Sequence, residues 1–154
     1  MLKKLAAVFG SAMLITASMG VTTPVFADDD RPPMSAESAA EVGVLMEPFF
    51  ATLQGGNAVD AYAALFKGTL LESKTTEVGQ LAAQTTFLLQ TYGTLSSWEM
   101  AKTECATPYV CKAIYVLLME KGPAAFWVYL YRRPSGVWQP TYVLMGDTPQ
   151  FFFD

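Results

Sequence analysis

The sequence predicts an α+β domain in which helices come first and a four-stranded antiparallel sheet follows. Two observations carry this prediction. Between residues 35 and 92, apolar side chains recur every three or four positions, which is the period of an amphipathic helix. After Gly93, β-branched and aromatic residues dominate and Gly or Pro interrupts them at intervals, which is typical of antiparallel strands. Helices followed by strands indicate N-terminal helices packed on one face of a curved sheet.

An export signal precedes this domain. Lys3 and Lys4 form a short basic start, an apolar stretch follows, and Val25-Phe26-Ala27 places compact residues at the −3 and −1 positions of a signal-peptidase site. An uncleaved membrane anchor is the alternative, since a span needs about 20 apolar residues. The Ser, Thr and Gly content and the cleavage pattern favour removal. We therefore expect residues 1–27 to be a signal peptide, and the mature protein to be periplasmic or secreted in a bacterium, with no membrane span after cleavage.

The mature chain is acidic. Removing 27 of the 154 residues takes away Lys3 and Lys4, which leaves eight basic against 14 acidic residues, a formal net charge of −6. Nucleic acid phosphates and anionic lipid headgroups repel such a protein, so a nucleic acid partner is not expected. Residues 28–34 are acidic and proline-rich and read as a disordered lead-in. Residues 35–154 form one domain.

Three helices are expected in the first half of the domain. They cover residues 36–54, residues 58–66, and a segment that begins between 72 and 76 and runs to 92. Ser35 and Asn57 are suitable N-caps for the first two helices. Pro48 is a point where the first helix can kink. Gly93 fits the position after the third helix, where a left-handed backbone is common.

Four strands are expected in the second half. They run from Leu95 to Ala106, Val110 to Lys121, Ala124 to Arg132, and Val137 to Met145. Gly122-Pro123 and Pro134-Ser135-Gly136 read as turns. Pro140 cannot donate a ladder hydrogen bond, so it predicts an edge position or a bulge for the fourth strand.

The two cysteines, Cys105 and Cys111, indicate a disulfide. An exported chain with an even number of cysteines usually pairs them. Pro108 lies between them in a predicted turn, so the two side chains would face each other across a hairpin. A redox-active pair is the alternative, but such pairs usually have two intervening residues and lie near a helix N-terminus.

Histidine is absent from the chain. This excludes a Ser-His-Asp triad, a Cys-His pair and any zinc site built on histidine within one chain. No catalytic residue, metal site or cofactor is predicted.

A loose family resemblance covers residues 35–153. Two helices, then Leu88-Leu89-Gln90-Thr91-Tyr92-Gly93 and Trp98-Glu99, resemble the nuclear transport factor 2-like superfamily, and in particular its small exported bacterial members of unknown function. The stretch from Phe126 to Arg133, followed by a turn and Val137-Trp138, is similar to the paired C-terminal strands of that superfamily. The resemblance implies a cone-shaped, cystatin-like α+β domain with a pocket between the helices and the sheet. The enzymes of the superfamily commonly use an Asp-His pair, which this chain cannot supply.

Six aromatic residues are candidates for lining a ligand pocket: Tyr62, Tyr92, Trp98, Tyr115, Trp127 and Trp138. Such side chains suit an apolar or ring-shaped ligand. The alternative is ordinary core packing and cross-strand pairing, which aromatic-rich sheets use routinely.

Four acids could serve a histidine-free enzyme: Asp60, Glu72, Glu99 and Asp147. In that hypothesis, one acid is buried beside a tyrosine and transfers a proton, as in an isomerase. The alternative places Asp60 and Glu72 near helix starts and Glu99 on an outward strand position.

The second and third strands carry apolar side chains on both faces, and one face would remain uncovered in a monomer. A homodimer would cover it, or the tail Phe151-Phe152-Phe153 would cover part of it. The leading hypothesis is a non-enzymatic exported domain that binds an envelope protein partner or a small apolar ligand through its pocket or sheet face. A histidine-free enzyme and a pure assembly module are the alternatives.

Overall fold

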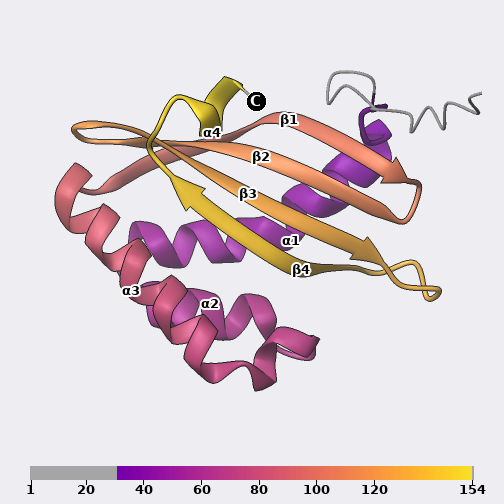
Figure 1. Ribbon diagram of the computed structural model, residues 1–154, viewed down its shortest axis with the longest axis horizontal. Coiled ribbons are helices and arrows are strands. Elements are labelled where there is room, and N and C mark those ends of the chain that lie inside the picture. The colour runs from indigo at the N-terminus through magenta and orange to yellow at the C-terminus, as the bar shows by residue number, and fades with distance from the viewer. Residues whose placement is uncertain (1–30, 154) are drawn as a thin grey trace, which may run out of the picture.

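The computed structural model describes residues 31–153, and it has the predicted α+β architecture (Figure 1). The expected signal peptide lies outside the described residues, as do residues 28–30 of the lead-in. The elements in chain order are α1 (Ala36–Gln54), α2 (Ala58–Phe66), the 3-10 helix η2 (Leu70–Ser73), α3 (Thr75–Tyr92), β1 (Leu95–Thr107), β2 (Val110–Met119), β3 (Gly122–Arg132), β4 (Trp138–Gly146) and α4 (Gln150–Phe153).

Side-chain caps begin the first two helices, as the sequence predicts. The Ser35 hydroxyl accepts a hydrogen bond from the Ser38 amide, and the Asn57 side chain accepts one from the Asp60 amide. These bonds satisfy N–H groups that the first turn of a helix leaves free. Pro48 lies inside α1, which continues to Gln54. Gly93 ends α3 with φ at 84°, a conformation that favours glycine.

The four strands form an antiparallel meander in the order β1-β2-β3-β4. Gly122 pairs with Met119 and Pro123 with Leu118, so β3 begins at Gly122, whereas the sequence predicted a turn there. The turn lies at Glu120 and Lys121 instead. A proline is tolerated at the start of a strand, where it costs the ladder little.

Pro140 lies where the sequence predicted, on an edge strand beside a bulge. β4 is the last strand of the sheet, and its register against β3 shifts between Tyr129 and Leu130. Tyr129 pairs with Tyr142 and Leu130 with Pro140, so Thr141 is the extra residue. Its hydroxyl donates to the Tyr129 carbonyl at 3.1 Å.

Helices α1, α2 and α3 lie on one face of the sheet, which we call the inner face (Figure 1). Phe49 and Phe50 of α1 both lie within 5.5 Å, between ring centroids, of Phe126 on β3. Phe49 also contacts Tyr62 of α2, and Phe50 contacts Tyr115 of β2. The interior between α1 and the sheet is therefore filled with aromatic rings. Helix α3 buries only Ala82 and Thr85, so it lies at the margin of this core.

The opposite, outer face of the sheet is partly covered by the C-terminal tail. Helix α4 lies on the side of the sheet away from the other helices (Figure 1). The Trp127 indole donates to the Phe151 carbonyl at 2.8 Å, and the two rings are 5.4 Å apart. A side chain at Gly146 would collide with the Phe151 ring. The sequence left open whether a homodimer or the C-terminal tail covers this face, and in the structure the tail covers part of it.

A buried ion cluster lies beside the tail on the outer face. The carboxylate of Glu104 lies 2.7 Å from the Lys102 ammonium and 2.9 Å from the Lys112 ammonium. Lys112 also stacks on the Trp127 ring, 4.5 Å from its centroid. Burial acts to raise the pKa of Glu104, but hydrogen bonds and positive charge from Lys102 and Lys112 hold it below its ordinary value.

The segment before α1 is held along β1. The Pro32 carbonyl accepts from the Cys105 amide at 2.8 Å, and the Met34 amide donates to the Thr103 hydroxyl at 3.0 Å. Met34 is buried. These contacts fix the end of the expected lead-in against the sheet. Within residues 31–153, no helix is long and apolar enough to cross a membrane.

Candidate functional site

A cavity of about 370 Å³ lies at the amino end of α1, and we call it the α1 cavity. Its walls come from four parts of the chain: the segment before α1, the first turn of α1, the β1–β2 hairpin, and the facing ends of β3 and β4. The docking of Pro32 and Met34 on β1 brings the first of these parts against the hairpin. The volume falls in the range of small-molecule sites, about 300–1,000 Å³.

Apolar groups make most of the wall. Met34, Pro108, the Cys105–Cys111 disulfide and Trp138 all line the cavity. Trp138 begins β4 and is 5 % exposed. An apolar ligand part placed here would leave water, which is favourable in proportion to the apolar area buried.

The predicted disulfide is present and joins paired residues of β1 and β2. Cys105 and Cys111 are a cross-strand pair, and the register shifts directly after them, between Cys105 and Thr107. This irregularity leads into the turn at Pro108. The bond thus fixes the hairpin that forms one side of the α1 cavity.

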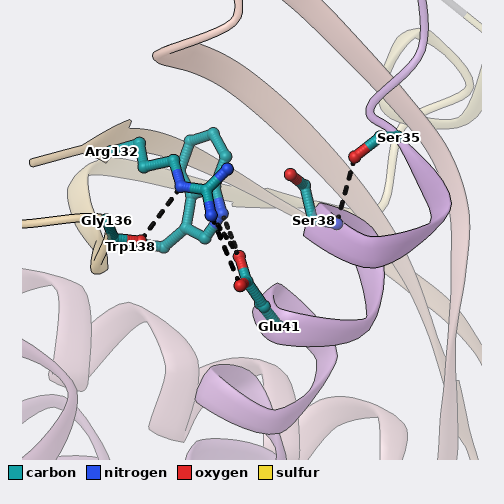
Figure 2. Close-up of polar contacts among 6 residues, drawn as sticks. All are labelled: Ser35, Ser38, Glu41, Arg132, Gly136 and Trp138. Atoms are coloured by element: carbon teal, nitrogen blue, oxygen red, sulfur yellow. Dashed lines mark hydrogen bonds and ion pairs between the residues drawn. The ribbon is translucent and has the colours of Figure 1, made fainter.

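Three polar side chains form a connected group at the edge of the cavity (Figure 2). Glu41 of α1 accepts from the Trp138 indole N–H at 3.1 Å and forms an ion pair with Arg132 at 3.2 Å. The Arg132 Nε–H donates to the Gly136 carbonyl at 3.0 Å, and its guanidinium lies over the Trp138 ring. Arg132 is therefore held in a defined position against the cavity by contacts on two sides.

Ser38 supplies a further polar group from the first turn of α1. It is only 7 % exposed and lines the cavity. Its amide is used in the Ser35 cap, whereas its hydroxyl forms no hydrogen bond with any residue in the described part of the chain. Figure 2 shows this hydroxyl on the side of α1 that faces Trp138 and Arg132.

The six aromatic candidates do not share one pocket. Tyr62 and Tyr115 are core residues, and Trp98 packs on Phe50 beside them. Tyr92 donates to Asp147 at the end of α3, and Trp127 lies on the outer face under Phe151. Only Trp138 lines the α1 cavity. The hydroxyl of Tyr62 bonds to that of Thr85 at 2.9 Å, and burial raises the Tyr62 pKa to about 12.

The four candidate acids are all exposed. Asp60 lies in the first turn of α2, and Glu99 lies on the outer face opposite Val116, as the structural alternatives predicted. Glu72 accepts from the Gly68 amide at 2.8 Å. Asp147 accepts from the Tyr92 hydroxyl at 2.5 Å, and this hydrogen bond raises the pKa of Tyr92. None of the four is a buried acid beside a tyrosine, which the proton-transfer hypothesis requires.

A further hollow, an apolar groove of about 290 Å³, lies between α2 and α3. Phe66, Val78 and Ala82 contribute to its wall, together with Tyr62 and Glu72. The last two are already engaged, in the bonds to Thr85 and the Gly68 amide. The groove has no lysine or arginine in its wall, whereas the α1 cavity has Arg132 to orient a ligand.

Three residues of the site were not predicted from the sequence: Ser38, Glu41 and Arg132. A signal for two of them was present. Ser38 lies four residues before Val42 on the buried face of α1, and Arg132 continues the inward series Phe126, Val128, Leu130 on β3. When two elements each carry a polar residue at a position that faces the core, a polar site is indicated where the two elements meet. Glu41 carries no such signal, because it lies off the buried face of α1 and 91 residues from its partner.

No protein-family model, curated protein or solved structure matches the chain. Among residues 31–153, no group of three or more Cys, Asp or Glu side chains is arranged to hold a metal ion.

Proposed function

We propose that the chain is an exported, non-enzymatic binding domain whose α1 cavity holds a small, largely apolar ligand. The observation that carries the proposal is the composition of that cavity. Met34, Trp138 and the disulfide provide apolar walls, and Ser38 and Arg132 provide polar groups at fixed positions. Small-molecule sites commonly combine a mainly apolar surface with a few placed polar groups.

The chemistry of the wall supports binding rather than catalysis. Arg132 is the one ionisable side chain that lines the cavity among the described residues, because both cysteines are joined in the disulfide. An arginine stays protonated at accessible pH, so it serves poorly as a general base. It serves well for orienting a ligand through its fixed N–H groups.

Export to an oxidising compartment, periplasmic or extracellular, is part of the same proposal. The signal-like segment before residue 28 and the Cys105–Cys111 disulfide both support it. Membership of the nuclear transport factor 2-like superfamily is also proposed. The order of helices and strands is compatible with it, although the aromatic core fills the space where a central pocket would lie.

A partner protein on the outer face is a second candidate function. The tail leaves part of this face uncovered: Tyr142 is 54 % exposed, Val110 45 % and Tyr131 36 %. Tyr142 pairs across the strands with the half-buried Tyr129, 5.7 Å between ring centroids. Such a surface suits a second copy of the chain or an envelope protein.

Native mass spectrometry of protein taken from its own compartment without denaturation tests the first proposal. The wild-type protein is expected to retain a small molecule, and Trp138→Leu is expected to lose it. Trp127→Leu is the matched control, because Trp127 lies on the outer face. A wild type that retains nothing and binds no small apolar compound would overturn the proposal. A bare homodimer would favour the outer face.

A further inference from the structure

We infer that the ligand of the α1 cavity is a small monocarboxylate, with its apolar body against Trp138 and the disulfide and its carboxylate between Ser38 and Arg132. This inference rests on the proposed function and names the chemical class of the ligand. It draws on two independent observations at one end of the cavity. One is the Ser38 hydroxyl, which has no hydrogen-bond partner among the described residues, and the other is the partly paired guanidinium of Arg132.

The Ser38 hydroxyl is available to a ligand in the cavity. The residue is 7 % exposed, and within residues 31–153 its hydroxyl donates to nothing. The oxygen itself is not fully buried and is open to the cavity, so an acceptor placed there can take this hydrogen bond in place of water. Its location in the first turn of the 19-residue α1 favours a negatively charged acceptor, because the N-terminal end of a helix carries a partial positive charge.

Arg132 offers the second donor. Its Nε–H is used by the Gly136 carbonyl and its Nη2 by Glu41, at 3.2 and 3.4 Å to the two carboxylate oxygens. Nη1 donates no hydrogen bond to any residue in the part of the chain that the structure describes. Arg132 lines the cavity, so this nitrogen is the group left to bind an acceptor there. Hydrogen bonds between a guanidinium and a carboxylate are among the strongest in proteins.

Glu41 weakens the attraction between Arg132 and a ligand carboxylate, so replacing Glu41 tests whether that attraction exists. Its negative charge offsets that of Arg132, while its oxygens also hold the Trp138 indole. Replacing Glu41 by Gln keeps an acceptor for Trp138 and removes the competing negative charge. The variant is therefore expected to bind a carboxylate more tightly and an uncharged ligand unchanged.

The remaining wall sets the size of the apolar body. A cavity of about 370 Å³ holds a molecule with a short alkyl chain or a single ring, not an extended lipid. Octanoate and phenylacetate are suitable probes, and octanol and phenylethanol are their uncharged partners. A cavity with only apolar recognition would favour the alcohols, because a carboxylate loses more hydration on entry.

Isothermal titration calorimetry of the exported protein with these two pairs is the test. We expect each carboxylate to bind about tenfold or more tightly than its alcohol, since a hydrogen bond to a charged group carries roughly that factor. Equal binding of acid and alcohol would overturn the carboxylate inference and leave the proposed function standing. No binding of any of the four probes would overturn both.

Variants locate the carboxylate. Ser38→Ala is expected to weaken octanoate binding by about tenfold and octanol binding by less, because a hydrogen bond to a charged acceptor is stronger than one to a neutral acceptor. Glu41→Gln is expected to strengthen octanoate binding. Arg133→Gln is the control, because it removes one positive charge next to Arg132 but outside the cavity. Arg133 is bonded to Gln139 and the Gly68 carbonyl, so the variant should change neither octanoate binding nor octanol binding. Octanoate binding that is unaffected by Ser38→Ala and by Glu41→Gln would overturn the inference.

Discussion

Tyr62 and Tyr115 are both buried tyrosines of the aromatic core, yet only one of their hydroxyls has a partner. Tyr62 bonds to Thr85 at 2.9 Å, whereas the Tyr115 hydroxyl has no hydrogen-bond partner among the described residues. Burial raises the pKa of both phenols. The same substitution should therefore have opposite effects at the two positions.

Tyr62→Phe is expected to destabilise the protein by about 1–2 kcal/mol, because the buried Thr85 hydroxyl loses its partner. Tyr115→Phe is expected to be neutral or stabilising by up to about 1 kcal/mol, because it removes a buried polar group that bonds to nothing. Urea denaturation at neutral pH measures both. Equal losses in the two variants would contradict this reading of the core.

The same tyrosines predict a loss of stability at alkaline pH. A phenol whose pKa is raised in the fold binds its proton more tightly there than in the unfolded chain. The contribution of Tyr62 is complete below its ordinary pKa of 10.0 and is lost as the pH rises through about 12. Denaturation curves across this window should show stability falling with pH, and less steeply in Tyr62→Phe. An identical slope in wild type and variant would refute the assignment.

The ion cluster on the outer face predicts a loss of stability at acidic pH. Because the Glu104 pKa is lowered in the fold, its contribution is present above its ordinary value of 4.5 and is lost as the pH falls through the lowered value. Glu104→Gln leaves Lys112 buried without its counter-charge and is expected to cost about 3 kcal/mol at neutral pH. Glu99→Gln, an exposed residue on the same face of β1, is the control and should cost less than about 0.5 kcal/mol. A cost for Glu104→Gln no larger than that of the control would show that the cluster adds no stability.

Reduction of the disulfide should loosen the β1–β2 hairpin and with it the α1 cavity. The loop between Cys105 and Cys111 is short, so loss of the bond is expected to cost about 2 kcal/mol. Ligand binding should weaken together with stability in Cys105→Ser/Cys111→Ser. Intact mass spectrometry of the wild type should show the loss of two hydrogens. A protein that binds ligand equally well without the bond would show that the hairpin does not depend on it.

Removal of the tail should expose the outer face. Deletion of residues after Pro149 removes Phe151 from Trp127, and the emission of Trp127 is expected to shift to longer wavelength. The uncovered apolar surface should also promote self-association, which sedimentation velocity measures. Phe153→Ala is the control, because Phe153 is exposed. Emission and oligomeric state unchanged by the deletion would contradict the covering role of the tail.

Much of the fold could be predicted from local pattern. The sequence predicted apolar side chains on both faces of β2, and the structure buries Ala113 and Tyr115 on the inner face and Ile114 on the outer face. The N-caps at Ser35 and Asn57 and the bulge at Pro140 follow from the chemistry of single residues. The start of β3 at Gly122 was missed because a Gly-Pro pair is compatible with both a turn and the first residues of a strand.

The site was harder to predict because its parts are distant in the sequence. The aromatic candidates were chosen by residue type, which does not distinguish a ring in the core, such as Tyr62, from one on a cavity wall, such as Trp138. The link between Glu41 and Arg132 spans 91 residues and depends on how α1 crosses the end of the sheet. The spacing of apolar residues along one helix or strand does not predict how α1 and the sheet cross.

Chemical-shift mapping by NMR during an octanoate titration tests the central claim most directly. The account predicts shifts for the amides of Ser35 and Ser38, for Cys105 and Thr107, and for the indole N–H of Trp138, all at the α1 cavity. Val59 and Val78 in the groove between α2 and α3 should not move. Shifts centred on that groove or on the outer face, with the α1 cavity unchanged, would contradict the claim.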